Sequence, residues 1–343
     1  MTNARHPIFG NTARKAKKRT EKQGTAARIF SAGTVLGVAA LLLRFTVVAP
    51  KAAAEAARAG LFTAGNAVLP SLFPFFVLSS LLIESGIGER LLTLPAKAVA
   101  RLFRVSRSGA CAILLGAFCG FPVGARVTAT LYRKDLVTRA EAERLLALSN
   151  APSFAFLYGT VGAGFFGSAA LGLRLYLSVL LSTWLTGLLL RPGKHRSEPL
   201  SVRTEQTQST AALFSGAITS AAHSALTVTA SLVFFSVTIA AADALLAFSD
   251  APTVLRIFLT GALELTSGIK KAAETSCGLC GICLCGFFAG FGGLCAHLQV
   301  IATAELPLPD RAEKEPITFR SYFLCKGMQG IFTALLFLVL SRI

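Results

Sequence analysis

Long runs of apolar residues constrain this chain more than any other feature of its sequence. The first extends from Ile29 to Pro50, and others cover 172–190, 225–248, 278–304 and 321–341. Each approaches or exceeds the roughly 20 residues that an α-helix needs to cross a bilayer. Only 15% of the 343 residues are charged, which argues against a water-soluble enzyme. We therefore predict an all-α polytopic membrane protein.

Two further apolar stretches contain helix breakers at their centres. The stretch 109–131 holds Gly120, Pro122 and Gly124 around a turn, and 254–275 holds a charged centre. Such turns leave backbone groups unpaired, which is tolerated only inside protein or beside a water-filled cavity. We predict that both stretches are re-entrant hairpins, and that Pro70 and Pro74 interrupt 61–85. The predicted crossing helices, about seven in number, are 29–50, 61–85, 145–167, 172–190, 225–248, 278–304 and 321–341.

The distribution of charge supports this topology. Lys and Arg number 34 against 17 Asp and Glu, and cytoplasmic loops carry the excess of basic residues. With the N-terminus cytoplasmic, most basic residues fall inside, and 86–108 has the spacing of an amphipathic helix in the headgroup layer. Nucleic-acid binding is the alternative for the basic tail 1–28, but contact with anionic membrane lipid explains it, so we expect no nucleic-acid partner. The predicted inside segments are 1–28, 86–108, 132–144, 191–210 and 305–320.

The two halves of the chain show a sparse internal repeat. Aligning them places Gly120 over Glu264, and Gly124-Ala125-Arg126 over Gly268-Ile269-Lys270. An odd number of crossings in each half makes the repeats inverted, as in many secondary transporters. The predicted domains are a basic cytoplasmic tail (1–28), a first transmembrane helix and connection (29–60), a first repeat (61–191), a polar cytoplasmic linker (192–210) and a second repeat (211–343).

The densest motif is Gly120-Phe121-Pro122-Val123-Gly124-Ala125-Arg126, followed by Asn150 and Ser153 on either side of Pro152. An exposed backbone turn beside a cation offers hydrogen-bonding groups to a ligand, and Arg within a span is rare unless functional. The alternative is that the glycines only permit close helix packing. The site interpretation takes Gly120, Pro122, Gly124, Arg126, Asn150 and Ser153 as solute-binding residues.

The second half supplies Glu264 within an apolar stretch, where a carboxylate is costly unless it is paired or hydrated. Arg126 or Lys270 is the predicted partner of Glu264, and a purely structural ion pair is the alternative. A third cluster holds His297 and Gln299, with Lys326 and Gln329 on the following span. A histidine in a bundle is also often a satisfied interhelical bond. The second-half candidates are Glu264, Thr266, Gly268, Lys270, His297 and Gln299.

Four cysteines occur within a short segment, at Cys277, Cys280, Cys283 and Cys285. A structural zinc site usually draws its ligands from separate chain segments, whereas these thiols resemble a small-residue helix face. We therefore predict neither a metal site nor a cofactor. The P-loop, HExxH and GxSxG signatures are missing as well, and we expect no enzyme activity.

Several of these motifs together resemble one family. Leu72-Phe73-Pro74-Phe75-Phe76, the Gly120 to Arg126 turn, Ser149-Asn150 and the segment Leu263 to Gly268 are similar to YlbJ-type sporulation integral membrane proteins. That family carries the "Gate" or nucleoside-recognition domain, similar to the core of concentrative nucleoside transporters. The resemblance implies a multi-pass protein of a bacterial cell membrane or forespore membrane that is needed for spore cortex formation.

We predict a permease for a small polar solute, such as a nucleoside, bound where the two hairpins meet. Glu264 would bond a hydroxyl or couple a proton, Arg126 would balance its charge, and Asn150 with Ser153 would orient the solute. The alternatives are a non-transporting scaffold that recruits partners through its basic loops during spore envelope assembly, and a solute sensor. Homo-oligomerisation stays open.

Overall fold

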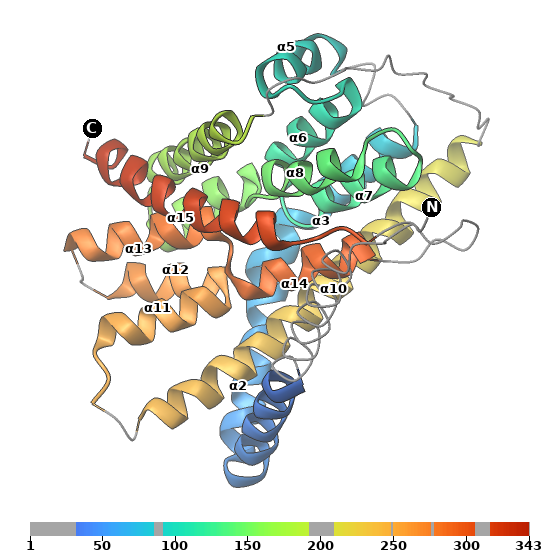
Figure 1. The fold of residues 1–343 in the computed structure, drawn as a ribbon. Helices are drawn as coiled ribbons and strands as arrows, with labels where there is room; N and C mark the ends of the chain where they lie inside the picture. The colour runs from blue at the N-terminus through green and yellow to red at the C-terminus, as the bar shows by residue number, and fades with distance from the viewer. Residues whose placement is uncertain are drawn as a thin grey trace, which may run out of the picture.

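The computed structural model describes residues 32–85, 92–191, 209–247, 250–275, 278–305 and 316–342. The predicted basic tail (1–28), most of the polar linker (192–210) and Cys277 lie outside these residues. Throughout the described part of the chain the regular elements are helices, as predicted (Figure 1).

Four helices in the described residues are long and apolar enough to cross a membrane. Each coincides with a predicted crossing helix. The count rises to six if two bent pairs, Ala32–Val48 with Pro50–Asn66 and Thr93–Phe103 with Arg107–Cys119, each form one span. The total of about seven crossings stays a prediction. The four spans are α9 (Ala169–Leu189), α10 (Thr210–Leu246), Gly278–Ala304, which joins α13 (Gly278–Phe291) to α14 (Gly293–Glu305), and α15 (Arg320–Leu340).

The predicted interruption of 61–85 by Pro70 and Pro74 is wrong. The chain stays helical through α2 (Pro50–Thr63), the π-helical turn η1 (Ala64–Val68) and α3 (Leu69–Glu84), with Pro74 inside α3. Pro70 has no backbone N–H, and the carbonyl that such an N–H would have bonded to lies within η1. The π-helical turn therefore accommodates the proline, and the chain stays helical.

Both predicted hairpins are helix–break–helix units. In the first, α6 (Arg107–Cys119) turns at Gly120–Pro122 into α7 (Val123–Arg133), which packs against it. In the second, α11 (Thr253–Leu263) turns at the single extended residue Glu264 into α12 (Leu265–Glu274). A Cβ on Gly268 would lie only 2.1 Å from the Cα of Gly261, so glycine allows α11 and α12 to touch.

Two other segments are broken in the middle. The helix α8 (Arg139–Ser149) ends at Asn150, and the π-helix η2 (Phe156–Phe165) begins a few residues later, so 145–167 is not a single helix. In the second half Gly292, with φ of +100°, separates α13 from α14. Glycine adopts a positive φ without a steric cost, so Gly292 allows the chain to break here.

The order of elements repeats in the two halves. A long helix, a hairpin, a broken pair and a final helix occur as α2–α3, α6–α7, α8–η2 and α9, and again as α10, α11–α12, α13–α14 and α15. The long helices pack against each other, and Figure 1 shows α2–α3 and α10 running in opposite directions. An inverted repeat requires this arrangement. Two described helices stand outside this order, Ala32–Val48 at the start and α5 (Thr93–Phe103) in the first half.

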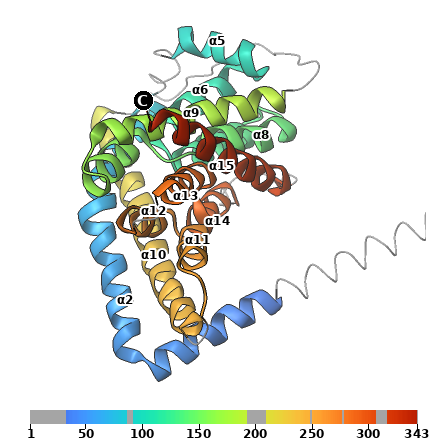
Figure 2. The same ribbon diagram turned by 90° about the vertical axis from the view of Figure 1, so that its left-hand side faces the viewer.

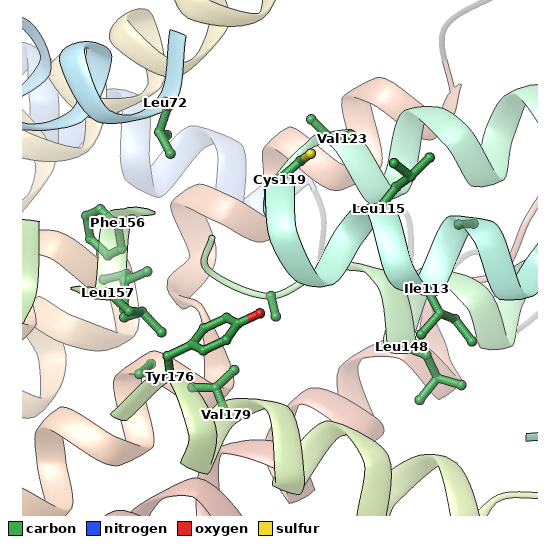
Figure 3. Close-up of a cluster of buried hydrophobic side chains, with 14 of the residues drawn as sticks. Leu72, Ile113, Leu115, Cys119, Val123, Leu148, Phe156, Leu157, Tyr176 and Val179 are labelled. Carbon is green, nitrogen blue, oxygen red and sulfur yellow. The ribbon is translucent and has the colours of Figure 1, made fainter. Parts of the chain in front are cut away.

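The helices of the first half enclose a large part of the apolar core. Figure 3 shows Ile113 and Leu115 of α6 on one side and Leu157 and Val179 of η2 and α9 on the other. Tyr176 reaches between them, and its hydroxyl donates a hydrogen bond of 3.2 Å to the Ala117 carbonyl. Because this core surrounds α6, it holds the first hairpin in place.

Close packing of the first hairpin against α8 depends on two glycines. A Cβ on Gly116 or Gly124 would lie 1.9 Å or 1.8 Å from the carbonyl oxygen of Ser149, which is backbone and has no room to move. We expect Gly124→Ala to destabilise the protein by about 1–3 kcal/mol through overpacking, measured as a lower midpoint of thermal unfolding in detergent.

The matched control is Gly327→Ala on α15, where nothing lies within 4 Å of the added Cβ. This control should leave the midpoint unchanged. Equal midpoints for Gly124→Ala and Gly327→Ala would contradict the packing described here.

Candidate functional site

The tip of each hairpin lies against the broken pair of its own half. In the first half Phe121 donates its backbone N–H to the Ala151 carbonyl at 3.1 Å, and a Cβ on Gly120 would lie 2.6 Å from the Ser153 nitrogen. In the second half a Cβ on Gly293 would lie 3.0 Å from the Leu265 nitrogen. Each half therefore brings two backbone breaks together.

The two pairs of breaks also meet each other. A Cβ on Gly292 would lie 3.0 Å from the Phe121 ring, which places the first hairpin against the break of α13–α14. A cavity of about 60 Å³ lies among the four breaks. This volume is enough to hold water. Its lining includes Phe121, Pro152, Ser153, Glu264, Thr266, Gly292 and Gln299.

Glu264 is 3% exposed and caps the start of α12. Its Oε1 accepts from the Thr266 N–H and its Oε2 from the Ser267 N–H, both at 2.7 Å. Two amide donors at a helix N-terminus stabilise a carboxylate without a basic side chain. Glu264 therefore faces the cavity from a rigid position.

The predicted ion pairs of Glu264 with Arg126 and Lys270 are wrong for the residues that the structure describes. Lys270 is a surface residue whose Nζ lies 3.9 Å from Oε1 of Glu274. Arg126 donates from Nη1 to the Ser80 hydroxyl at 3.3 Å, in a separate chamber. The backbone amides of α12 stabilise the Glu264 carboxylate in place of the predicted basic side chain.

The chamber that contains Arg126 is much larger than the central cavity, with a volume of about 610 Å³. It lies between α3, α7, α10 and α14, and Pro122 forms part of its wall beside the central cavity. Its described lining contains Arg126, Arg133 and Lys134 but no carboxylate. Three basic side chains therefore line this chamber.

Asn150 and Ser153 use their side chains to stabilise the break of α8–η2. Asn150 is fully buried, accepts from the Ala125 N–H at 2.9 Å and donates to the Leu146 carbonyl at 2.8 Å. The Ser153 hydroxyl accepts from the Phe156 N–H at 3.1 Å. Ser153 lines the cavity and Asn150 lies behind it, so only Ser153 is in a position to contact a solute there.

His297 and Gln299 lie on α14 but face different surroundings. His297 is fully buried, and its Nδ1 lies 2.9 Å from the Tyr322 hydroxyl, outside the cavity lining. Gln299 lines the cavity, and its Nε2 donates to the Cys295 sulfur at 3.5 Å. His297 thus forms an interhelical bond through Nδ1, whereas its buried Nε2 has no hydrogen-bond partner among the described residues, and its role as a solute ligand stays a prediction.

Lys326 was noted in the sequence but not included among the predicted site residues. It is fully buried between the rings of Phe121 and Tyr322, whose centroids lie 5.5 Å and 6.0 Å from Nζ. Its ammonium donates to the Asn150 carbonyl, and to Oε1 of Gln329 at 2.7 Å. A lysine in an apolar run is a signal for function. It connects α15 of the second half to the break of the first.

The remaining predicted residues have packing or surface positions. Gly124 and Gly268 allow close helix contacts, and Thr266 lies in the cavity wall. In the cysteine segment Cys280 is exposed and Cys285 is buried, with its sulfur 3.8 Å from the Ile269 carbonyl. The described residues contain no group of three or more metal-ligating side chains.

Long apolar helices, hairpins and buried breaks define a polytopic α-helical membrane protein. No protein-family model and no solved structure matches the chain. The sporulation integral membrane protein YlbJ of Bacillus subtilis is 29% identical over 338 aligned residues, covering 88% of this chain and 81% of that protein. This similarity supports the resemblance of the chain's motifs to YlbJ-type sporulation integral membrane proteins.

The side chain of Asn150 provides a test of how the breaks are held. Asn150→Ala removes the acceptor of the Ala125 N–H and leaves this buried donor unpaired, which costs about 1–3 kcal/mol. We expect a lower midpoint of thermal unfolding. Asn66→Ala is the control, because the Asn66 amide bonds only to the Phe62 carbonyl at an exposed position. An Asn150→Ala midpoint as high as that of the control would show that the bond does not support the break.

Proposed function

We propose that this protein is a permease that moves a small polar solute across a bacterial membrane during spore formation, through the point where its two halves meet. The observation that carries the proposal is the convergence of four backbone breaks, two from each half, around a small cavity lined by Glu264. Secondary transporters with inverted repeats bind solutes at such breaks, because the exposed backbone groups and helix termini supply ligands. The name of the Bacillus relative supports the link to sporulation.

The small central cavity and the larger chamber fit two stages of one path. Phe121 lines the central cavity and Pro122 lines the chamber, so the first hairpin separates them. A rocking of one half against the other would join the two spaces and admit a solute to Glu264. The central cavity would then hold the solute, and the chamber would form the entrance from the predicted cytoplasmic side.

The charges of the chamber favour a particular kind of solute. Arg126, Arg133 and Lys134 can donate hydrogen bonds to a solute that carries a negative group. An ionised Glu264 repels such a solute, so we expect a proton to accompany it. In this scheme Arg126 balances the charge of the solute in the chamber.

Flux into proteoliposomes tests the proposal directly. Labelled uridine, uridine monophosphate and succinate represent a neutral nucleoside, a phosphorylated one and a dicarboxylate, and we expect uptake of at least one. Glu264→Gln should lower its initial rate about tenfold or more, because a charge-assisted hydrogen bond is worth about 1.5–3 kcal/mol. Glu274→Gln is the matched control, since Glu274 ends the same helix at the surface.

Two results would overturn parts of this proposal. Normal uptake by Glu264→Gln at equal reconstitution removes Glu264 from the path. If the unchanged protein moves none of the solutes, and captures partner proteins through 86–108 and 132–144, the chain is a scaffold of spore envelope assembly. Saturable binding without net flux identifies a sensor.

A further inference from the structure

A second site lies at the outer end of α9, away from the central cavity. The helix α5 crosses this end beside the start of α6, and Figure 2 shows it at the edge of the molecule above α9. A concavity of about 400 Å³ lies there. No carboxylate is among its described lining residues, which are Lys97, Ala100, Arg101, Arg104, Val105, Arg107 and Arg191.

The cations are held by packed elements rather than by a loose loop. Phe103 at the end of α5 is buried, and its ring centroid lies 6.4 Å from that of Trp184 on α9. A Cβ on Gly187 would lie 2.8 Å from the Phe103 ring, so α5 rests directly on α9. Nη2 of Arg144 donates to the Phe103 carbonyl at 3.1 Å and satisfies the end of α5.

Five basic side chains around one concavity call for a ligand with several anionic oxygens. Guanidinium groups bind phosphate with paired hydrogen bonds, and four of the five residues are arginines. Both an inorganic phosphate and the headgroup of a phospholipid offer this chemistry. The surroundings of the concavity distinguish them.

The outer face of α9 carries exposed leucines. Leu181, Leu185 and Leu188 are 45%, 41% and 40% exposed and share one helix face, and Arg191 follows directly after the end of α9. Leu94, on α5 itself, is 78% exposed. Inorganic phosphate makes no favourable contact with an apolar surface, whereas an acyl chain buries that surface. The combination of a cationic concavity with an apolar stripe is what a phospholipid requires.

We propose that this concavity binds an anionic phospholipid, with its phosphate among Lys97, Arg101, Arg104, Arg107 and Arg191 and an acyl chain along the leucine stripe of α9. The site fastens α5 to the membrane surface at the end of a crossing helix. It does not depend on the permease proposal.

Native mass spectrometry of the full chain in detergent tests the site. The probes are dioleoyl phosphatidylglycerol, dioleoyl phosphatidylcholine and inorganic phosphate. We expect phosphatidylglycerol to be retained in preference to the other two. The triple variant Arg101→Gln/Arg104→Gln/Arg191→Gln should weaken its binding about a hundredfold.

A matched triple variant controls for net charge. Lys51→Gln/Arg58→Gln/Lys270→Gln removes the same charge from exposed positions elsewhere and should leave binding unchanged. If the first triple variant does not fold, the single variants Arg101→Gln and Arg191→Gln replace it, because both side chains are exposed.

Three outcomes would overturn the proposal. Equal retention of phosphatidylglycerol and phosphatidylcholine would show no headgroup selection. Phosphate binding as tight as phosphatidylglycerol binding would identify a free-anion site. Equal weakening by both triple variants would mean that overall charge, and not this concavity, attracts the lipid.

Discussion

The backbone hydrogen bonds at the four breaks are the constraint on which the rest of this structure depends. In an apolar interior an unpaired N–H or C=O group is costly, so a broken helix persists only if polar groups compensate it. Here Asn150 accepts from the first hairpin, Ser153 caps η2 and Glu264 caps α12. The side chains that the sequence suggests as solute ligands therefore accept hydrogen bonds from the backbone at the breaks.

The same constraint determines how the halves are joined. Lys326 and Gln329 of α15 bond to the backbone of Asn150 and Ala147 at the end of α8. Deeper along the same interface, the hydroxyls of Ser182 and Thr333 lie 2.6 Å apart. These contacts cross between repeats, so any rocking of one half against the other must exchange them. Through its bond to the Asn150 carbonyl, Lys326 links α15 directly to the break of the opposite repeat.

Patterns of glycine, proline and apolar residues predict most of the fold. They correctly identify the breaks of both hairpins and the four helices that are long enough to cross a membrane. The failures have a common physical origin, since sequence patterns say little about where backbone groups lie. Pro70 is accommodated by a π-turn, and Glu264 finds two amides rather than a basic side chain. Lys326 lies near the start of an apolar run, where a cation usually marks the water boundary.

The length of α10 has a consequence for how the protein sits in a bilayer. Its 37 residues extend about 55 Å, whereas the hydrocarbon core is about 30 Å thick. The helix must either lean strongly or project into water, and it ends near the ion pair of 3.0 Å between Asp243 and Lys271. Since α10 is packed along α2–α3, a thicker or thinner bilayer would turn both helices together. The protein is thereby sensitive to the thickness of the membrane that surrounds it.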